Sequence, residues 1–93
     1  MESLSSGVQY RHWSVDDAEA CVLLAHGLAE HTGRYEHVAA RFNERGVAVV
    51  GPDHMGHGAS PGVRVYLKTF SQYLGPMQAL RARIDEWYPG RPV

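Results

Sequence analysis

Two short apolar runs that flank a segment of helical periodicity constrain the fold of this chain more than any other feature. The runs are CVLLA at 21–25 and VAVV at 47–50, and each is continuous and of strand length. Such runs are typical of strands covered on both faces in a parallel sheet. Between them, 34–45 carries apolar residues at helical spacing, namely Tyr35, Val38, Ala39 and Phe42. A strand, a helix and a strand with short connections predict a βαβ unit with parallel strands and a right-handed crossover.

Particular residues predict where the elements of this unit begin and end. Thr32 or Gly33 is expected to cap the start of the helix, and Gly46 stands where a left-handed residue would end it. Residues 7–15 alternate partly between apolar and polar, which predicts a strand with one solvated face. Residues 51–62 are rich in Gly and Pro and predict one long loop.

A second amphipathic helix is predicted near the end of the chain, where Met77, Leu80 and Ile84 recur at helical spacing. Proline is costly inside a helix but favourable at its first position. We therefore expect this helix to start near Pro76, after a turn at 70–74. The stretch VRVYL at 63–67 suits a short extended piece.

Length and composition indicate a small folded α/β unit. Ninety-three residues suffice for one small domain, and 44% apolar with 20% charged residues argues against disorder. Sheets normally contain about five or six strands, and RPV at 91–93 has the pattern of another strand beginning. We therefore interpret residues 1–93 as the amino-terminal segment of a single α/β domain.

The charge pattern and the single cysteine narrow the functional classes. A net charge of −1 and scattered Lys and Arg residues give no electrostatic footprint for nucleic acid or for an anionic membrane. Cys21 lies in an apolar run and is expected to be buried in a reducing compartment. The start of the chain has no apolar signal region, and no apolar stretch reaches the ~18 residues that cross a bilayer. A cytoplasmic protein is expected, and its oligomeric state is left open.

Two loops rich in glycine and histidine, HGLAEHTG at 26–33 and GPDHMGHGAS at 51–60, follow the carboxyl ends of the two apolar strands. In parallel α/β sheets, ligands bind outside the carboxyl ends of the strands. We therefore predict that both loops lie side by side at one edge of the sheet and form a ligand site.

These two loops resemble a known family. HGLAEHTGRYEHVAARFNERG followed by GPDHMGHGAS is similar to the amino-terminal third of the monoacylglycerol lipase and lysophospholipase group of α/β-hydrolases, the serine aminopeptidase S33 type. The resemblance runs from about Cys21 to Val93. It implies part of an α/β-hydrolase fold with a mostly parallel sheet. It also implies a serine carboxylic-ester hydrolase for monoacylglycerol or lysophospholipid esters, without a cofactor, and membrane contact through a lid outside this chain.

The resemblance assigns roles in an oxyanion hole, where backbone N–H groups stabilise the anion formed during acyl transfer. By matching position, the Leu28 N–H is one such donor, Gly27 permits a sharp turn, and His26 braces the loop. The residues implied to border a polar pocket for the alcohol end of the ester are Glu30, His31 and Arg34. A structural alternative is that Glu30 and Arg34 pair with each other or solvate the start of the helix.

The stretch GASPG at 58–62 matches the G-x-S-x-G pattern of a serine-hydrolase nucleophile. Its context does not fit, since no strand runs into it, and Pro61 lacks the N–H that would complete an oxyanion hole. We therefore expect Ser60 to bond to backbone groups in a turn. By resemblance, the nucleophile, acid and histidine of the triad all lie outside this chain.

The polar residues of the second loop, Asp53, His54 and His57, are expected to be structural. The histidine spacings match no standard zinc site, so no metal is expected. The chain departs from the family pattern at Ala29, where glycine is common, and at Met55, where arginine is common. The Met55 change removes a cation that would tie the loop down. The pair Gly75-Pro76 interrupts a stretch that is more regularly helical in relatives.

Other functions stay open from the sequence. An S33-type peptidase fits the same motifs, because the deciding residues lie outside the chain. Epoxide hydrolases and dehalogenases usually carry H-G-x-P, which HGLA lacks. A non-catalytic truncated α/β-hydrolase fragment is the alternative from another class. A nucleotide-binding module is disfavoured, because neither G-x-G-x-x-G nor a P-loop lysine is present.

Overall fold

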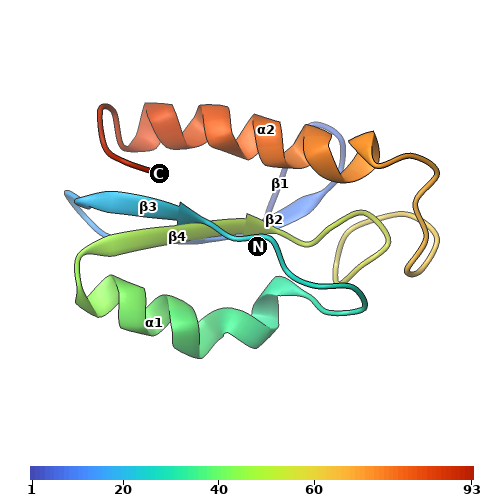
Figure 1. The fold of residues 1–93 in the computed structure, drawn as a ribbon, viewed down its shortest axis with the longest axis horizontal. Coiled ribbons are helices and arrows are strands. Elements are labelled where there is room, and N and C mark those ends of the chain that lie inside the picture. The colour runs from blue at the N-terminus through green and yellow to red at the C-terminus, as the bar shows by residue number, and fades with distance from the viewer.

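The computed structural model describes residues 1–93 and has three layers, with one helix on each face of a four-stranded sheet (Figure 1). The strands are β1 (Glu2–Ser3), β2 (Gln9–Trp13), β3 (Ala20–Leu23) and β4 (Val47–Pro52), in the order β1-β2-β4-β3. The helices are the short 3₁₀ helix η1 (Thr32–Tyr35), α1 (Glu36–Glu44) and α2 (Ser71–Trp87). No helix is both long enough and apolar enough to span a membrane.

The predicted βαβ unit is confirmed. β3 and β4 are parallel, with Cys21 opposite Ala48 and Leu23 opposite Val50, and α1 connects them. β4 pairs on its other side with the antiparallel β2, which in turn pairs with β1. The sheet is therefore mixed, and its parallel pair is the part that positions the two glycine-rich loops.

The hydrophobic core lies between the sheet and α2. Cys21 is buried within it, as expected, and burial raises the pKa of its thiol to about 11, so the group stays a neutral thiol. The buried members of this core are Leu4, Val8, Tyr10, Ala18, Cys21, Ala48, Val50, Leu80, Ile84 and Tyr88.

The start of the first helix differs from the prediction, and its end agrees with it. The residue that caps η1 is His31, whose ring Nδ1 accepts the Gly33 N–H over 3.1 Å. Thr32 is fully buried and uses its hydroxyl elsewhere, so the predicted cap at Thr32 or Gly33 is wrong. Gly46 has φ of +78°, the left-handed conformation that ends a helix.

The second helix begins earlier than predicted. α2 starts at Ser71 and runs through Pro76, so neither the turn expected at 70–74 nor the interruption at Gly75-Pro76 is present. A proline disfavours helical geometry in the preceding residue partly through that residue's Cβ, and Gly75 has none. The helix loses one backbone hydrogen bond at Pro76, while Pro76 itself is buried.

In two further segments, the structure differs from the prediction made from the sequence. Residues 63–67 form turns rather than an extended piece, and Val65 has φ of +57°. Residues 91–93 are not a strand, but the Pro92 carbonyl accepts the Cys21 N–H over 3.0 Å. The last residues therefore lie beside the outer edge of β3 (Figure 1).

Candidate active site

The two loops meet at the carboxyl ends of β3 and β4, as predicted from their positions in the sequence (Figure 1). Four hydrogen bonds join them, two between Thr32 and Asp53 and two between His26 and His54. The His54 backbone N–H donates to His26 Nε2 over 2.9 Å, and His54 Nε2 donates to the His26 carbonyl over 3.1 Å. The loop contact therefore depends on both imidazole rings.

His26 has a defined tautomer, because one ring nitrogen faces a hydrogen-bond donor and the other faces an acceptor. Nε2 accepts the His54 N–H, so the ring proton is on Nδ1, which donates to the Gly27 carbonyl over 2.7 Å. Burial lowers the pKa of His26, although the Gly27 hydrogen bond acts in the opposite direction. His26 is thus a neutral brace between the turn after β3 and the loop after β4.

His54 and His57 are buried beside His26, with ring centroids 4.1 Å and 5.2 Å from the His26 ring. His57 Nδ1 lies 3.1 Å from the Met55 carbonyl, and the His54 ring stacks on Tyr73 with a centroid distance of 4.7 Å. Burial lowers the pKa of His54, and the nearby His26 lowers it further. No three His, Cys, Asp or Glu side chains of the chain are arranged to hold a metal ion.

The turn at Leu28 presents an unused backbone donor. The Glu30 N–H donates to the Gly27 carbonyl over 3.3 Å, which closes the turn, and Ala29 has φ of +62°. No protein group accepts the Leu28 N–H, and the Leu28 side chain is 73% exposed. Leu28 lines a cavity of about 370 Å³, with a mainly apolar lining completed by Ala25, His26, His54, His57, Phe70, Tyr73, Leu74 and Met77.

Glu30 belongs to this turn rather than to an ion pair with Arg34. Its Oε1 accepts the Tyr35 hydroxyl over 2.6 Å and the Gly27 N–H over 3.4 Å. The Tyr35 hydrogen bond is the main reason that the pKa of the Glu30 carboxyl lies below its ordinary value. Arg34 forms no ion pair, so the alternative pairing of Glu30 with Arg34 is not found. Both residues line a second, shallow cavity of about 200 Å³.

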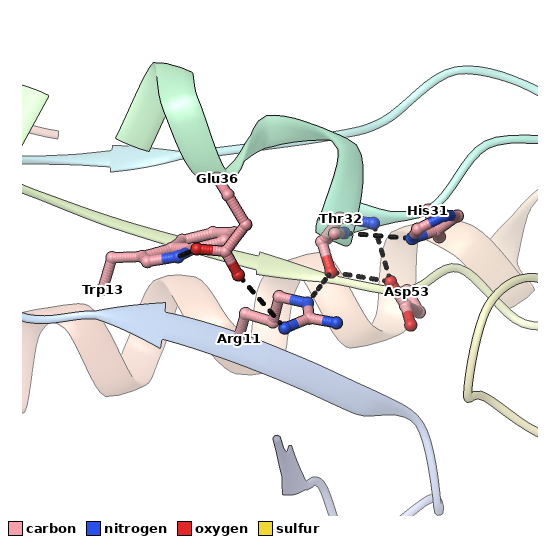
Figure 2. A network of polar contacts seen from close by, with 7 residues as sticks. Arg11, Trp13, His31, Thr32, Glu36 and Asp53 are labelled. Atoms are coloured by element: carbon pink, nitrogen blue, oxygen red, sulfur yellow. Dashed lines mark hydrogen bonds and ion pairs between the residues drawn. The ribbon is translucent and has the colours of Figure 1, made fainter. Parts of the chain in front are cut away.

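Asp53 lies at the centre of a buried polar network (Figure 2). Its Oδ1 accepts the Thr32 N–H over 2.8 Å and the Thr32 hydroxyl over 2.7 Å, while Oδ2 accepts the Ala59 N–H over 2.9 Å. Burial alone would raise the pKa of Asp53, but these hydrogen bonds outweigh it and the pKa is lowered. The carboxylate therefore joins the start of η1 to the loop after β4.

The network continues from Thr32 towards the surface (Figure 2). Arg11 on β2 donates through Nε to Thr32 Oγ1 over 3.2 Å and pairs with Glu36 at 3.3 Å. Trp13 Nε1 donates to the other oxygen of the Glu36 carboxylate over 2.8 Å. β2 thereby supports the start of the first helix, a role for Arg11 and Trp13 that the sequence pattern did not indicate.

Ser60 is a structural residue, as its context predicted. Its side chain is buried, its hydroxyl donates to the Asp53 carbonyl over 2.5 Å, and its oxygen accepts the Gln9 N–H over 2.9 Å. With both functions of the hydroxyl occupied by backbone groups, Ser60 ties the loop after β4 to β2.

Comparison with known proteins agrees with this arrangement. A family model described as "Serine aminopeptidase, S33" matches residues 16–93. The chain belongs to this family of α/β-hydrolases. A protein of Mycolicibacterium smegmatis named monoacylglycerol lipase is 46% identical over 74 residues, which are 78% of this chain and 26% of that protein. The crystal structure of Paleococcus ferrophilus monoacylglycerol lipase is 31% identical with a TM-score of 0.68, over 86% of this chain and 29% of that one.

The chain therefore spans about a quarter of the length of the first curated relative. A shorter relative also exists. A Vaccinia virus protein is 33% identical over 67 residues, which are 71% of this chain and 83% of that protein. Its length is consequently similar to that of this chain.

The family pattern that places arginine at position 55 also draws attention to Arg64, which sequence reasoning missed. Met55 is half-buried and packs against the core. Arg64 instead donates to the carbonyls of Gly58 over 3.0 Å and Ser60 over 2.5 Å, and to that of Gly62 over 3.2 Å. Arg64, nine residues after Met55, thus supplies the cation that holds this loop in place. The position of an arginine directly after a Gly- and Pro-rich loop could have indicated this role from the sequence.

Proposed function

We propose that this chain supplies the oxyanion-hole turn of a serine carboxylic-ester hydrolase that acts on monoacylglycerol or lysophospholipid esters. One observation carries the proposal. The Leu28 N–H has no acceptor and belongs to a residue lining a mainly apolar cavity of about 370 Å³. Family membership and the names of the relatives support the same reaction class.

In the proposed mechanism, a serine outside residues 1–93 attacks the ester carbonyl and a histidine takes its proton. The carbonyl oxygen becomes an oxyanion, and the Leu28 N–H donates a hydrogen bond to it. Donors that are fixed before the reaction stabilise this charge most, because no reorganisation is needed at the transition state. The bond from His26 Nδ1 to the Gly27 carbonyl and the bond from the Gly27 N–H to Glu30 hold the turn in place.

For the alcohol end of the ester, we propose the polar surface formed by Glu30, His31 and Arg34. Arg34 is exposed, forms no ion pair, and lines the shallow cavity together with Glu30 and Tyr35. The His31 ring is exposed as well, although its Nδ1 accepts the Gly33 N–H. A guanidinium and a carboxylate side by side can donate to and accept from the hydroxyls of a glyceryl group.

A chimera tests the proposal. Residues 20–93 of this chain replace the corresponding part of the Mycolicibacterium smegmatis lipase, and hydrolysis of a monoacylglycerol is measured. We expect Leu28→Pro, which removes the N–H, to lower kcat by roughly 10²–10³-fold. Leu28→Ala keeps the N–H and is the matched control, expected to change kcat far less. Equal kcat values for the two variants would show that the Leu28 N–H is not a donor of the oxyanion hole.

Esterase and peptidase activity are distinguished on a longer product of the same gene, because the deciding residues lie outside residues 1–93, and a monoacylglycerol and aminoacyl p-nitroanilides are offered to it in parallel. Turnover of the anilide alone would favour the S33-type peptidase. For the 93-residue chain by itself, we expect no turnover of p-nitrophenyl butyrate above background. Activity that disappears in Ser60→Ala would contradict the structural role of Ser60.

A second candidate function is a non-catalytic product, and the Vaccinia virus relative of similar length favours it. Reading the coding DNA beyond the codon for Val93 distinguishes the two. An open frame that encodes a strand and G-x-S-x-G within about 15 residues would support the hydrolase, whereas an immediate stop codon would support the non-catalytic product. For either product, the buried free thiol of Cys21 favours a reducing, cytoplasmic setting.

A further inference from the structure

The turn that carries Leu28 is held at both ends by two consecutive residues of the loop after β4. At its start, His54 makes two hydrogen bonds to His26, over 2.9 and 3.1 Å. At its end, Asp53 Oδ1 accepts the Thr32 N–H over 2.8 Å and the Thr32 hydroxyl over 2.7 Å (Figure 2). Because Asp53 and His54 are neighbours in the chain, the two attachments of the turn have a fixed spacing.

The attachment at Thr32 depends on its hydroxyl group. Thr32 is fully buried, so this hydroxyl needs partners within the protein. A hydroxyl has a single proton to donate, and it can also accept a hydrogen bond. Arg11 Nε donates to Thr32 Oγ1 over 3.2 Å, which leaves the hydroxyl proton for the Asp53 carboxylate (Figure 2). Serine could make the same two bonds, whereas valine, which has nearly the shape of threonine, could make neither.

Gly58 brings the loop after β4 against the same end of the turn. Its φ is +49°, and a Cβ at this position would overlap the Asp53 carboxylate and lie 2.9 Å from the Cβ of His31. Only a residue without a side chain can approach both groups so closely. The loop after β4 therefore packs directly against the last residues of the turn.

We propose that Thr32 is a positioning residue of the oxyanion hole, and that its bonds to Asp53 set where the Leu28 N–H lies. The inference rests on the proposed function, because it concerns the same donor. Without the Thr32 hydroxyl, one of the two bonds at this end is lost, so the Leu28 peptide is held less firmly. An oxyanion donor must lie about 2.7–3.1 Å from the oxyanion, so a displacement of about 1 Å removes much of its effect.

Inhibition of the chimera with the Mycolicibacterium smegmatis lipase tests the proposal, because residues 20–93 include the whole attachment at Thr32. The probe is an alkyl trifluoromethyl ketone, which adds to a nucleophilic serine and places an oxyanion where the transition state has one. We expect Thr32→Val to raise the inhibition constant about tenfold and to lower kcat by a similar factor, with KM changed by less than about twofold. The conservative Thr32→Ser should leave all three values within about twofold of the unmodified chimera.

Gly58→Ala is a second variant, which disturbs the same end of the turn from the loop. We expect it to raise the inhibition constant as Thr32→Val does, because the added methyl group displaces the Asp53 carboxylate. Gly90→Ala is the matched control. Gly90 also has a positive φ, +76°, but a Cβ there would contact no other part of the chain, so the inhibition constant should not change.

Three results would overturn the proposal. The first is a lower kcat in Thr32→Val with an unchanged inhibition constant, because a merely structural role reduces the amount of active enzyme and not its affinity for the inhibitor. The second is an equal loss in Thr32→Ser and Thr32→Val. The third is an effect of Gly90→Ala as large as that of Gly58→Ala.

The failure of this proposal can be distinguished from the failure of the proposed function. If the Leu28 N–H is not an oxyanion donor, Leu28→Pro and Leu28→Ala have equal inhibition constants. If only the role of Thr32 is wrong, Leu28→Pro raises the inhibition constant and Thr32→Val does not. The 93-residue chain offers a measurement that needs no activity, since Thr32→Val should shift the amide NMR resonances of residues 27–30. Unchanged resonances would contradict the positioning role.

Discussion

The loop after β4 and the turn after β3 lie at the same edge of the sheet but are built in opposite ways. In the loop, Asp53 and Ser60 are buried, and each side chain makes at least two hydrogen bonds, one or more of them to another segment of the chain. In the turn, Gly27, Leu28 and Ala29 are exposed, and the Leu28 N–H has no partner. The Asp53 and Ser60 side chains are thus occupied by protein partners, whereas the turn leaves a backbone donor free.

This difference indicates how a small scaffold can present a backbone donor. A free N–H is useful for binding an anion only if the peptide that carries it does not move. The rigidity comes both from bonds within residues 26–30 and from the neighbouring loop through the His26 and His54 contacts. Three substitutions and one change of pH test this difference between the loop and the turn.

Removal of the Asp53 carboxylate should have the largest effect, because it leaves two buried donors on Thr32 and the partly buried Ala59 N–H without an acceptor. We expect Asp53→Ala to lower the free energy of unfolding by about 3–5 kcal/mol, measured by urea denaturation. Asp53→Asn keeps one acceptor oxygen and is the matched control, expected to lose less. An effect of Asp53→Ala below about 1 kcal/mol would show that the loop does not depend on this network.

Ser60→Ala removes the link between the loop after β4 and β2. The Gln9 N–H loses its acceptor and the Asp53 carbonyl loses its donor, so we expect a loss of about 2 kcal/mol in the same measurement. Ser5→Ala is the control, because Ser5 is exposed. If both substitutions cost the same, the Ser60 hydroxyl is not a structural link.

Mild acid should weaken the contact between the two loops. Burial lowers the pKa of His26 and of His54, so below about pH 6.5 the unfolded chain binds protons that the folded chain does not. The free energy of unfolding should therefore fall as the pH is lowered from 7 to 5.5. His12, whose pKa burial also lowers, contributes in the same direction. We expect His26→Gln to reduce this pH dependence, and His37→Gln, at an exposed position, to leave it unchanged. If the free energy of unfolding had the same slope against pH in both variants, His26 would not be a source of the pH dependence.

The smallest effect concerns the turn itself. Ala29 has φ of +62°, a conformation that costs a residue with a Cβ roughly 1 kcal/mol. We expect Ala29→Gly to raise the free energy of unfolding by up to about 1 kcal/mol, with Ala40→Gly in α1 as a control that should lower it. A destabilised Ala29→Gly chain would show that the turn is not strained.

Much of the framework could be predicted because it depends on short-range patterns. The apolar runs at 21–25 and 47–50 correspond to β3 and β4, and Gly46 ends the intervening helix as expected. The errors came from context that lies far away in the sequence. Pro76 is accommodated inside α2 by Gly75 and by burial, and His31 caps η1 because Thr32 is used by Asp53, 21 residues further along.

The βαβ unit, the family and the edge of the sheet at which the two loops meet could be inferred from residue patterns, because periodicity and strand polarity are local properties of the chain. Which polar groups are occupied and which are free depends on how the chain folds. Ser60, Asp53 and Glu30 have the chemistry of catalytic residues, yet each accepts hydrogen bonds from groups that the fold brings to it. The residue type determines which hydrogen bonds a side chain can make. The packing of distant segments determines whether those hydrogen bonds are already made within the protein.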